Sequence, residues 1–253
     1  MGRALPALAR LAEEAATALQ RGGRIVYIGA GTSGRLAALD AAECPPTFGM
    51  PPSRVIALVA GGSRALRQSV EGAEDDGEAG RTAVRRAAVG PLDLTIGVSA
   101  SGTTRFVLAA LDEARHRRAA TCLITSNPSA RHHGMRVLLR TGRELVAGST
   151  RMKAGSATKM ALSLFSTGAM LRLGRVREGR MVDLSPTNQK LRDRAVRIVM
   201  ELGGADRRTA EDALASNGWR VRAALDARSR SCARRQARSG NRGRRWAPKT
   251  TCQ

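Results

Sequence analysis

The stretch 25-IVYIGAGTSGRLAALDAAECPPTFG-49 is the most informative about the fold, because a strand-like apolar run leads through a glycine-rich loop into a helix. Its glycines Gly29, Gly31 and Gly34 have the spacing G-x-G-x-x-G of dinucleotide-binding loops. A dinucleotide site also needs an acidic residue about 20 positions later, at the end of the second strand. That strand ends in 58-LVAGG-62, which has no acid. The sequence therefore favours another phosphate ligand.

The same arrangement recurs along the chain after a helical lead-in over residues 5–19. Three more strand-like runs follow, 54-RVIALVAGG-62, 93-DLTIGVSASG-102 and 121-TCLITSNPSA-130, with helical segments between them. Strands that alternate with helices predict an α/β fold, a three-layer αβα sandwich with a mainly parallel sheet and right-handed crossovers. A ligand is then expected at the carboxyl ends of the strands.

Composition limits the class of protein. The chain has 253 residues, a length that suggests one large domain or one domain plus an appendage. Since 42% of the residues are hydrophobic and only 2% aromatic, aliphatic and alanine side chains must fill the core. No apolar run approaches the roughly 20 residues of a membrane span, and we expect a cytoplasmic protein without a membrane partner. The four cysteines are too far apart for a C-x-x-C pair and are expected to be free thiols: Cys44, Cys122, Cys232 and Cys252.

The net charge of +22 is concentrated at one end of the chain. Residues 227–253 contain eight Arg and one Lys and no acid. This segment has almost no aliphatic residues, so we expect a basic, disordered tail. Such a tail binds nucleic acid weakly and with steep salt dependence, and no specific nucleic-acid partner is expected.

Two hydroxyl-rich loops each stand between a strand and a helix, 31-GTSG-34 and 99-SASGTT-104. Backbone N–H groups at a helix start, together with Ser or Thr hydroxyls, form a neutral cradle for one phosphate. Two facing loops suit a phosphorylated sugar better than a long dinucleotide. The alternative is that these hydroxyls only cap helices. The candidate phosphate ligands, of which Ser33 and Ser101 are best placed, are Thr32, Ser33, Ser99, Ser101, Thr103 and Thr104.

Several segments carry a resemblance to a known family. The chain resembles the N-acetylmuramic acid 6-phosphate etherases of the sugar-isomerase-type (SIS) phosphosugar-binding superfamily from about residue 22 to about residue 225. The resemblance implies a cytosolic homodimeric lyase of cell-wall sugar recycling, which converts N-acetylmuramic acid 6-phosphate into N-acetylglucosamine 6-phosphate and D-lactate. The segments that carry it are IGAGTSGRLAALDAAECPPTFG, EGAEDD, SASGTT, GSTRMKAGSATKMALSLFSTGAM and MVDLSPTNQKL.

Cleavage of an ether at C3 of a sugar is feasible as a β-elimination followed by addition of water. This chemistry needs a base at C2, an acid at the ether oxygen and a phosphate anchor, and it needs no metal and no cofactor. The resemblance implies that Glu43 protonates the departing lactate and that Glu74 is the base for C2 or for water, with roles that can interchange. Glu43 is expected after the helix that follows the first glycine-rich loop, where apolar segments on both sides shield it from solvent.

Other interpretations of these residues stay open. The acids of 71-EGAEDDGE-78 could be a solvated helix face, on which Glu71 and Glu74 share i, i+3 spacing, and only the family motif selects Glu74. Lys153 could supply positive charge to the phosphate or could be a helix-surface lysine. A non-catalytic phosphosugar-binding regulatory protein would need only the two hydroxyl loops.

The chain divides into four expected parts. These are an N-terminal helix (1–21), the SIS domain (22–185), a C-terminal helical segment (186–226) and the basic tail (227–253). The third part resembles the start of a small helical cap domain. Family members carry a longer N-terminal segment and further cap helices, so the resemblance implies truncation at both ends, which a shifted reading frame would explain at the C-terminus.

Overall fold

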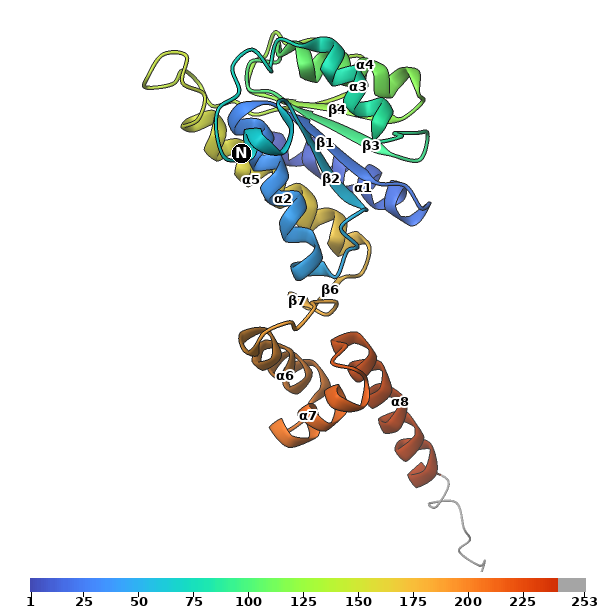
Figure 1. Cartoon of the computed structure of the whole chain (residues 1–253). Helices are drawn as coiled ribbons and strands as arrows, with labels where there is room; N and C mark the ends of the chain where they lie inside the picture. Colours follow the sequence, from blue (N-terminus) through green and yellow to red (C-terminus); the bar gives the residue numbers. More distant parts are fainter. Residues whose placement is uncertain (241–253) are drawn as a thin grey trace, which may run out of the picture. The chain divides into compact units, whose positions relative to one another are not determined.

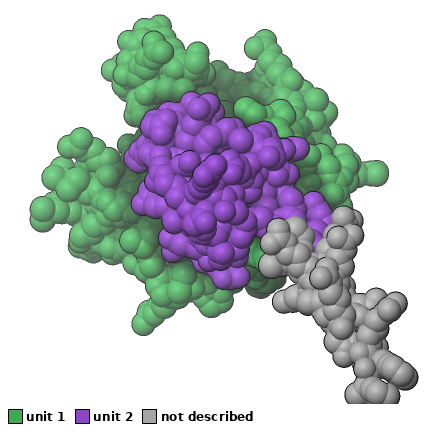
Figure 2. Space-filling model, turned by 90° about the horizontal axis from the view of Figure 1, so that it is seen from below, with its two compact units in different colours: residues 1–177 green, residues 178–253 purple. Residues whose placement is uncertain are grey.

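The computed structural model describes residues 1–240, of which 231–240 are described by their backbone alone. The chain forms two compact units that divide between Arg177 and Glu178 (Figure 2). The first unit contains a parallel five-stranded sheet in the order β2-β1-β3-β4-β5. Its strands are β1 (Ile25–Gly29), β2 (Val55–Val59), β3 (Leu94–Val98), β4 (Ala120–Thr125) and β5 (Met135–Leu138).

Helices cover both faces of this sheet (Figure 1). On one face lie α1 (Leu5–Gln20), α2 (Gly31–Phe48) and α5 (Lys153–Arg172). On the other lie α3 (Gly77–Arg86) and α4 (Arg105–His116). Two short 3-10 helices, η1 (Gly2–Ala4) and η2 (Gly62–Leu66), complete the unit. The predicted three-layer αβα sandwich with a parallel sheet is confirmed.

The first glycine-rich loop is built for close packing of a strand against a helix. A Cβ on Gly34, in the first turn of α2, would lie 2.8 Å from the carbonyl oxygen of Gly29 at the end of β1. Real Cβ atoms do not approach backbone so closely, so both positions need glycine. Gly31 between them has φ of +52°, in the left-handed region that glycine tolerates. The fingerprint glycines thus have a packing role, independent of any dinucleotide.

Three local expectations are corrected. The sheet has a fifth strand, β5, which is only four residues long and too short for its pattern to be recognised. Helix α2 continues through Pro45 and Pro46 to Phe48, so Glu43 lies inside the helix and not after it. The segment 71–76 is not helical, because Asp76 caps α3 by accepting a hydrogen bond from the Ala79 N–H at 2.8 Å.

The second unit is helical and has a core of its own. It contains α6 (Gln189–Gly203), α7 (Arg207–Ser216) and α8 (Val221–Gly240), and the two-residue strands β6 (Val176–Arg177) and β7 (Arg180–Met181) pair at the boundary. The division falls before the expected residue 186, because Val182 and Leu184 pack into the helical core.

Helix α8 also changes the expected start of the tail. Its backbone is helical to Gly240, so disorder from residue 227 is wrong for 227–240. Arg and Ala have high helix propensity, and a helix started by the buried residues Val221, Ala224 and Leu225 can propagate through them. Residues 241–253 lie outside the described part of the chain.

Two further expectations concern thiols and membranes. Cys44 and Cys122 are free buried thiols, as predicted, and burial raises the pKa of each to about 12. The side chains of Cys232 and Cys252 lie outside the described residues. Among the described helices, none combines the length and the apolar character that a membrane crossing requires.

Candidate active site

The two hydroxyl-rich loops lie side by side at the carboxyl edge of the sheet. Strands β1 and β3 are parallel neighbours, with Gly29 in register with Val98, and one loop follows each strand directly. Thr32 and Ser33 are half-buried in the first turn of α2. The loop 99–104 leads into α4. The structure therefore brings all six predicted phosphate ligands to adjacent loops.

A network of hydroxyl groups organises the second loop. The buried Ser99 Oγ lies 2.8 Å from Thr104 Oγ1 and 3.3 Å from Ser101 Oγ, and it accepts a hydrogen bond from the Gly102 N–H at 3.0 Å. Ser101 Oγ accepts hydrogen bonds from the Thr103 N–H and hydroxyl at 3.2 and 3.0 Å. Ser99 thus holds the loop from inside, while the exposed Ser101 and Thr103 face solvent.

These hydroxyls do not cap the helices that follow them. Ala30 is at the N-cap of α2 and Thr104 at the N-cap of α4, and neither helix has a side-chain cap among the described residues. Thr104 bonds Ser99 instead. Neither helix start is therefore closed by a side-chain oxygen, although the Phe106 N–H of α4 donates to the Glu74 carbonyl at 3.0 Å. A phosphate is an acceptor that suits such a helix N-terminus. We call these two loops the cradle.

Asn127 supports the cradle from the end of the next strand. Its Nδ2 donates to the Ser101 carbonyl at 2.8 Å, and the neighbouring Thr125 hydroxyl donates to the Ala100 carbonyl at 3.2 Å. The sequence analysis did not select either residue. The pattern that could have indicated them is the Ser/Asn turn at the end of the fourth predicted strand. This turn has the same position relative to the sheet as the two loops.

Glu74 lies next to the cradle. Its carbonyl accepts a hydrogen bond from the Phe106 N–H at 3.0 Å, in the first turn of α4, and its side chain is exposed. Glu74 and Glu71 both line a cavity of about 290 Å³ that also touches Ala30, Gly31 and Arg35. A carboxylate therefore lies beside the cradle.

Arg35 fixes the wall of this cavity. From α2 its Nε donates to the Ala65 carbonyl at 2.9 Å and its Nη2 to the Gln68 carbonyl at 3.2 Å. These bonds hold η2 and the residues that follow it against the start of α2. The arginine follows 31-GTSG-34 directly, yet nothing in its local pattern shows that it would reach 30 residues along the chain.

Glu43 is not part of this group. It lies near the end of α2, and its side chain is 56% exposed, which corrects the expectation of a shielded carboxyl. Its Oε2 lies 3.3 Å from the Nζ of Lys159 on α5, and that ammonium also donates to the Ser163 hydroxyl at 3.0 Å. Glu43 does not line the cavity of Glu74, because it lies near the opposite end of α2 from Gly31 and Arg35, which do line it.

A buried carboxyl holds this part of α2 in place. Asp40 is 3% exposed and accepts hydrogen bonds from the Tyr27 hydroxyl of β1 at 2.7 Å and the Ser166 hydroxyl of α5 at 3.0 Å. Desolvation by burial raises the pKa of Asp40 to about 6, against the effect of these hydrogen bonds. The signal in the sequence was an acid within the apolar run of α2 and the chain's one tyrosine within a buried strand.

Lys153 is at the start of α5, where its Nζ donates to the Arg143 carbonyl at 2.9 Å. The first N–H groups of α5, those of Lys153 and Ala154, donate to the Glu144 carboxylate at 3.0 and 2.9 Å, which lowers the pKa of Glu144. This helix start therefore already holds an anion. It is close to the cradle, since a Cβ on Gly155 would lie 3.6 Å from Thr32 Cγ2.

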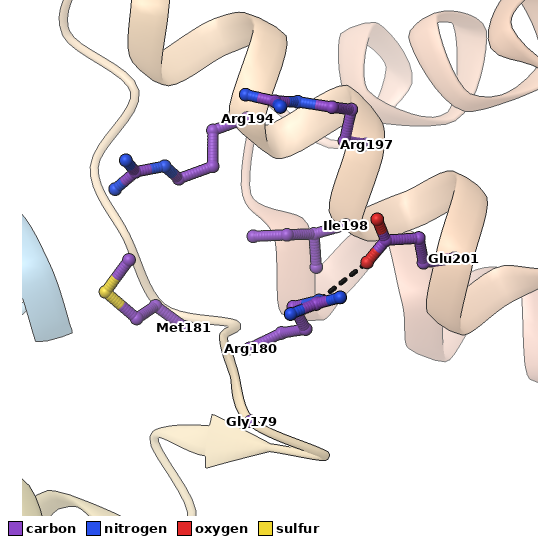
Figure 3. A pocket seen from close by; sticks show the side chains of 7 residues that line it. All are labelled: Gly179, Arg180, Met181, Arg194, Arg197, Ile198 and Glu201. Atoms are coloured by element: carbon purple, nitrogen blue, oxygen red, sulfur yellow. Dashed lines mark hydrogen bonds and ion pairs between the residues drawn. The ribbon is translucent and has the colours of Figure 1, made fainter.

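A second pocket, of about 340 Å³, lies in the helical unit (Figure 3). Arginines dominate its lining, and the Nε of Arg180 is 2.6 Å from the Glu201 carboxylate. The pocket contains none of the predicted site residues and no hydroxyl cradle. Its lining residues are Gly179, Arg180, Met181, Arg194, Arg197, Ile198 and Glu201. The cradle with Glu74 is the better candidate for an active site.

Comparisons with known proteins agree with this choice. Residues 7–115 match the family described as the glucokinase regulatory protein N-terminal SIS domain. A solved structure from Bacteroides fragilis, described as a phosphosugar isomerase involved in capsule formation, is similar with a TM-score of 0.52 at 18% identity. It covers 68% of this chain and 82% of its own. That likeness supports the fold.

Curated relatives are much more similar in sequence. An N-acetylmuramic acid 6-phosphate etherase of Serratia proteamaculans is 48% identical over 226 residues, 88% of this chain and 76% of its own length. One of Deinococcus radiodurans is 49% identical over 225 residues, 88% of this chain and 74% of its own length. At this identity and coverage, the chain belongs to the N-acetylmuramic acid 6-phosphate etherase family.

Proposed function

We propose that the chain cleaves the D-lactyl ether of N-acetylmuramic acid 6-phosphate to N-acetylglucosamine 6-phosphate and D-lactate, as a carbon–oxygen lyase of cell-wall sugar recycling. The observation that carries the proposal is the uncapped pair of helix starts at the cradle, next to the Glu74 carboxylate. Membership of the family identifies the sugar phosphate that this arrangement would bind.

The reaction follows from the groups at hand. The sugar opens to its C1 aldehyde, which acidifies the proton at C2. Glu74 removes this proton, the C2–C3 double bond forms, and the C3–O bond breaks as Glu43 protonates the leaving lactate oxygen. Water then adds at C3, and a proton returns to C2. Each proton transfer needs only a positioned carboxyl group, which contributes typically about 10²–10⁴-fold in rate.

The cradle would bind the phosphate with neutral donors. Backbone N–H groups of α2 and α4 and the hydroxyls of Thr32, Ser33, Ser101 and Thr103 supply it, while Ser99 and Thr104 hold the loop. Lys153 would add positive charge only after its ammonium leaves the Arg143 carbonyl. The phosphorylated sugar does not cross membranes freely because of its charge, so we place the reaction in the cytoplasm.

We also propose that the chain works as a homodimer through α5. One side of α5 is buried, yet its opposite side also carries large apolar residues, with Met160 52% and Leu171 50% exposed. Large apolar side chains grouped on an exposed helix face are typical of a surface that a partner covers. We call the exposed residues the neutral stripe; they are spaced by three or four and are Ser156, Met160, Leu164, Thr167 and Leu171.

A second copy is the partner that suits the neutral stripe. Two chains of net charge +22 repel each other, and an uncharged surface brings no further like charges together. An isologous contact also needs a patch that is complementary to itself, as an uncharged apolar stripe is. Light scattering on the native protein should give the mass of two chains, and on Leu164→Arg the mass of one. If the native protein has the mass of one chain, the dimer is contradicted.

Labelled water tests the reaction itself. The protein is incubated with N-acetylmuramic acid 6-phosphate in ¹⁸O-water, and products are followed by mass spectrometry. We expect D-lactate without label and N-acetylglucosamine 6-phosphate with one ¹⁸O at C3. Label in lactate would contradict elimination, because it requires attack of water on the lactyl carbon. Binding of the sugar phosphate without lactate release would instead indicate a regulatory phosphosugar-binding protein.

A further inference from the structure

The pocket of the helical unit has an excess of positive charge. Three guanidinium groups, those of Arg180, Arg194 and Arg197, line it together with one carboxylate, that of Glu201. The formal charge of its lining is therefore +2. All the lining residues belong to the second unit, so the pocket is formed without any part of the cradle.

One face of α6 supplies most of the pocket. Four lining residues on this helix are spaced by three or four positions, which brings them onto one stripe. They are Arg194, Arg197, Ile198 and Glu201. Strand β7 supplies the other wall through Arg180 and Met181 (Figure 3). The arginines are therefore held on two regular elements that face the same space.

Two of the three guanidinium groups are not neutralised by the protein. The Glu201 carboxylate lies 2.6 Å from the Nε of Arg180, and Asp193, the other acid of α6, is paired with an arginine of α7 at 3.5 Å. Within the described part of the chain, neither Arg194 nor Arg197 has a hydrogen bond or an ion pair. Residues three positions apart on a helix are neighbours, so these two like charges repel each other until an anion binds.

The pocket also has an apolar surface beside these charges. Ile198 is 3% exposed and lies between the α6 arginines and Arg180 (Figure 3). Met181 and Arg194 are half-buried. A partly buried charge is screened by salt less than an exposed one, so Arg194 attracts an anion more strongly than a fully solvated arginine does.

Charge and size indicate the class of ligand. A guanidinium group can donate two parallel N–H bonds to the oxygens of a phosphate. A phosphate monoester carries a charge of about −1.5 to −2 near pH 7, which complements the +2 of the lining. A carboxylate or a phosphodiester carries only one negative charge. The volume of about 340 Å³ falls within the range of about 300–1,000 Å³ that small organic ligands occupy.

We propose that this pocket binds a small organic phosphate monoester. Arg194 and Arg197 hold the phosphate, and the carbon skeleton lies against Ile198 and Met181. The helical unit is then a ligand-binding unit with a site of its own. This site is independent of the etherase reaction, because none of its residues belongs to the cradle or carries a catalytic carboxyl.

Hydrogen exchange followed by mass spectrometry shows where such a ligand binds. The probe is glycerol 3-phosphate, added to the full chain until the exchange rates no longer change, with sodium chloride of equal ionic strength as the reference. We expect slower exchange of the backbone amides of α6 and of residues 179–181. Slower exchange at the cradle loops alone, or nowhere, would overturn the proposal. Because the two regions are read separately, a failure of the cradle to bind would count only against the proposed function.

Arg194→Gln tests the guanidinium groups. The affinity, read from the concentration dependence of protection in α6, should fall roughly 10–100-fold, the effect of one lost hydrogen bond to a charged group. Arg208→Gln is the matched control, since it removes the same charge from α7 outside the pocket and should keep the native affinity. An equal loss in both variants would mean that an anion is only attracted to a basic surface, which would overturn the proposal.

Two further measurements define the site. Arg197→Gln repeats the test at an exposed residue, where a substitution does not disturb the core, and should also weaken protection of α6. Dimethyl phosphate should bind more weakly than glycerol 3-phosphate because it carries one charge. Equal affinity for the two probes would indicate a site for phosphodiesters, such as a nucleic-acid backbone, and would contradict the monoester.

Discussion

The cradle and the α2–α5 face around Glu43 differ in how far apart in the sequence their hydrogen-bonded residues lie. In the cradle, hydroxyls and backbone N–H groups come from short loops, and each bond within the second loop joins residues at most five positions apart. Around Glu43, the bonds of Asp40 and Lys159 join elements more than 100 residues apart, from Asp40 to Ser166 and from Glu43 to Lys159. The second loop of the cradle is thus a local structure, whereas the Glu43 face exists only after the layers pack.

The difference also separates binding from chemistry. The cradle has two helix starts without a side-chain cap and is built from neutral groups, which suits an anion that must bind and leave. The Glu43 face has a buried carboxyl under an exposed one, which fixes geometry but leaves the outer group accessible. Substitutions in the cradle should weaken substrate binding, whereas substitutions in the Glu43 face should alter catalysis or the pH dependence of stability.

The largest effect is expected from Glu74→Gln. The amide cannot take the C2 proton, so kcat should fall by about 10²–10⁴-fold. The free energy of unfolding should change by less than about 0.5 kcal/mol, because the side chain is exposed. Glu71→Gln changes the same wall of the cavity and is the control, with near-native kcat expected. Equal losses in both variants would show that the cavity needs charge and not a base.

Asp40→Asn should alter the pH dependence of stability. The folded pKa of about 6 lies above the unfolded value near 4, so the stabilising contribution is complete below about pH 4 and is lost as pH rises through 6. A pKa that differs by about 2 between the folded and unfolded states corresponds to about 3 kcal/mol of stability. Urea unfolding between about pH 4 and pH 8 should show native stability falling by this amount relative to Asp40→Asn.

Glu14→Gln, on the exposed side of α1, is the control for that experiment and should keep the native pH profile. Parallel profiles for native protein and Asp40→Asn would mean that Asp40 titrates at its ordinary pKa. The buried network around Asp40 would then make no pH-dependent contribution to stability, and the Glu43 face would not differ from the cradle in this respect.

A smaller effect is expected within the cradle, from Ser101→Ala. Loss of one hydrogen bond to a charged phosphate corresponds to about 1.5–3 kcal/mol, or roughly 10–100-fold in KM, with unfolding unchanged. Ser99→Ala removes the buried organiser and should cost about 1–3 kcal/mol of stability as well. If Ser101→Ala lowers stability as much as Ser99→Ala, both hydroxyls are structural.

The smallest effect on stability is expected from Lys159→Met. The ion pair with Glu43 is open to solvent, with the two side chains 36% and 56% exposed, so its loss should change the free energy of unfolding by less than about 1 kcal/mol. Urea unfolding of this variant beside Lys159→Arg measures the difference. A loss well above about 1 kcal/mol would assign the pair to the core of the fold and not to its surface.

Much of the fold and half of the site could be predicted from sequence. The four longer strands, the two hydroxyl loops and the start of α1 all follow from short-range patterns in the chain. The predictions failed where contacts between residues far apart in the sequence determine the secondary structure. Helix α2 continues through two prolines because Phe48 is buried in the core formed with α1 and α5, and β5 forms because β4 offers it an edge.

Local patterns in the chain were enough to specify the layered parallel fold, the two hydroxyl-rich loops and the family, because glycine spacing, alternation of elements and hydroxyl-rich turns act between neighbours in the chain. Packing of the layers was needed to place Glu74 beside the cradle, and to bring Asp40, Tyr27 and Ser166 together in the core. Distances between residues on different layers depend on how helices pack on the sheet, and no local pattern contains that information.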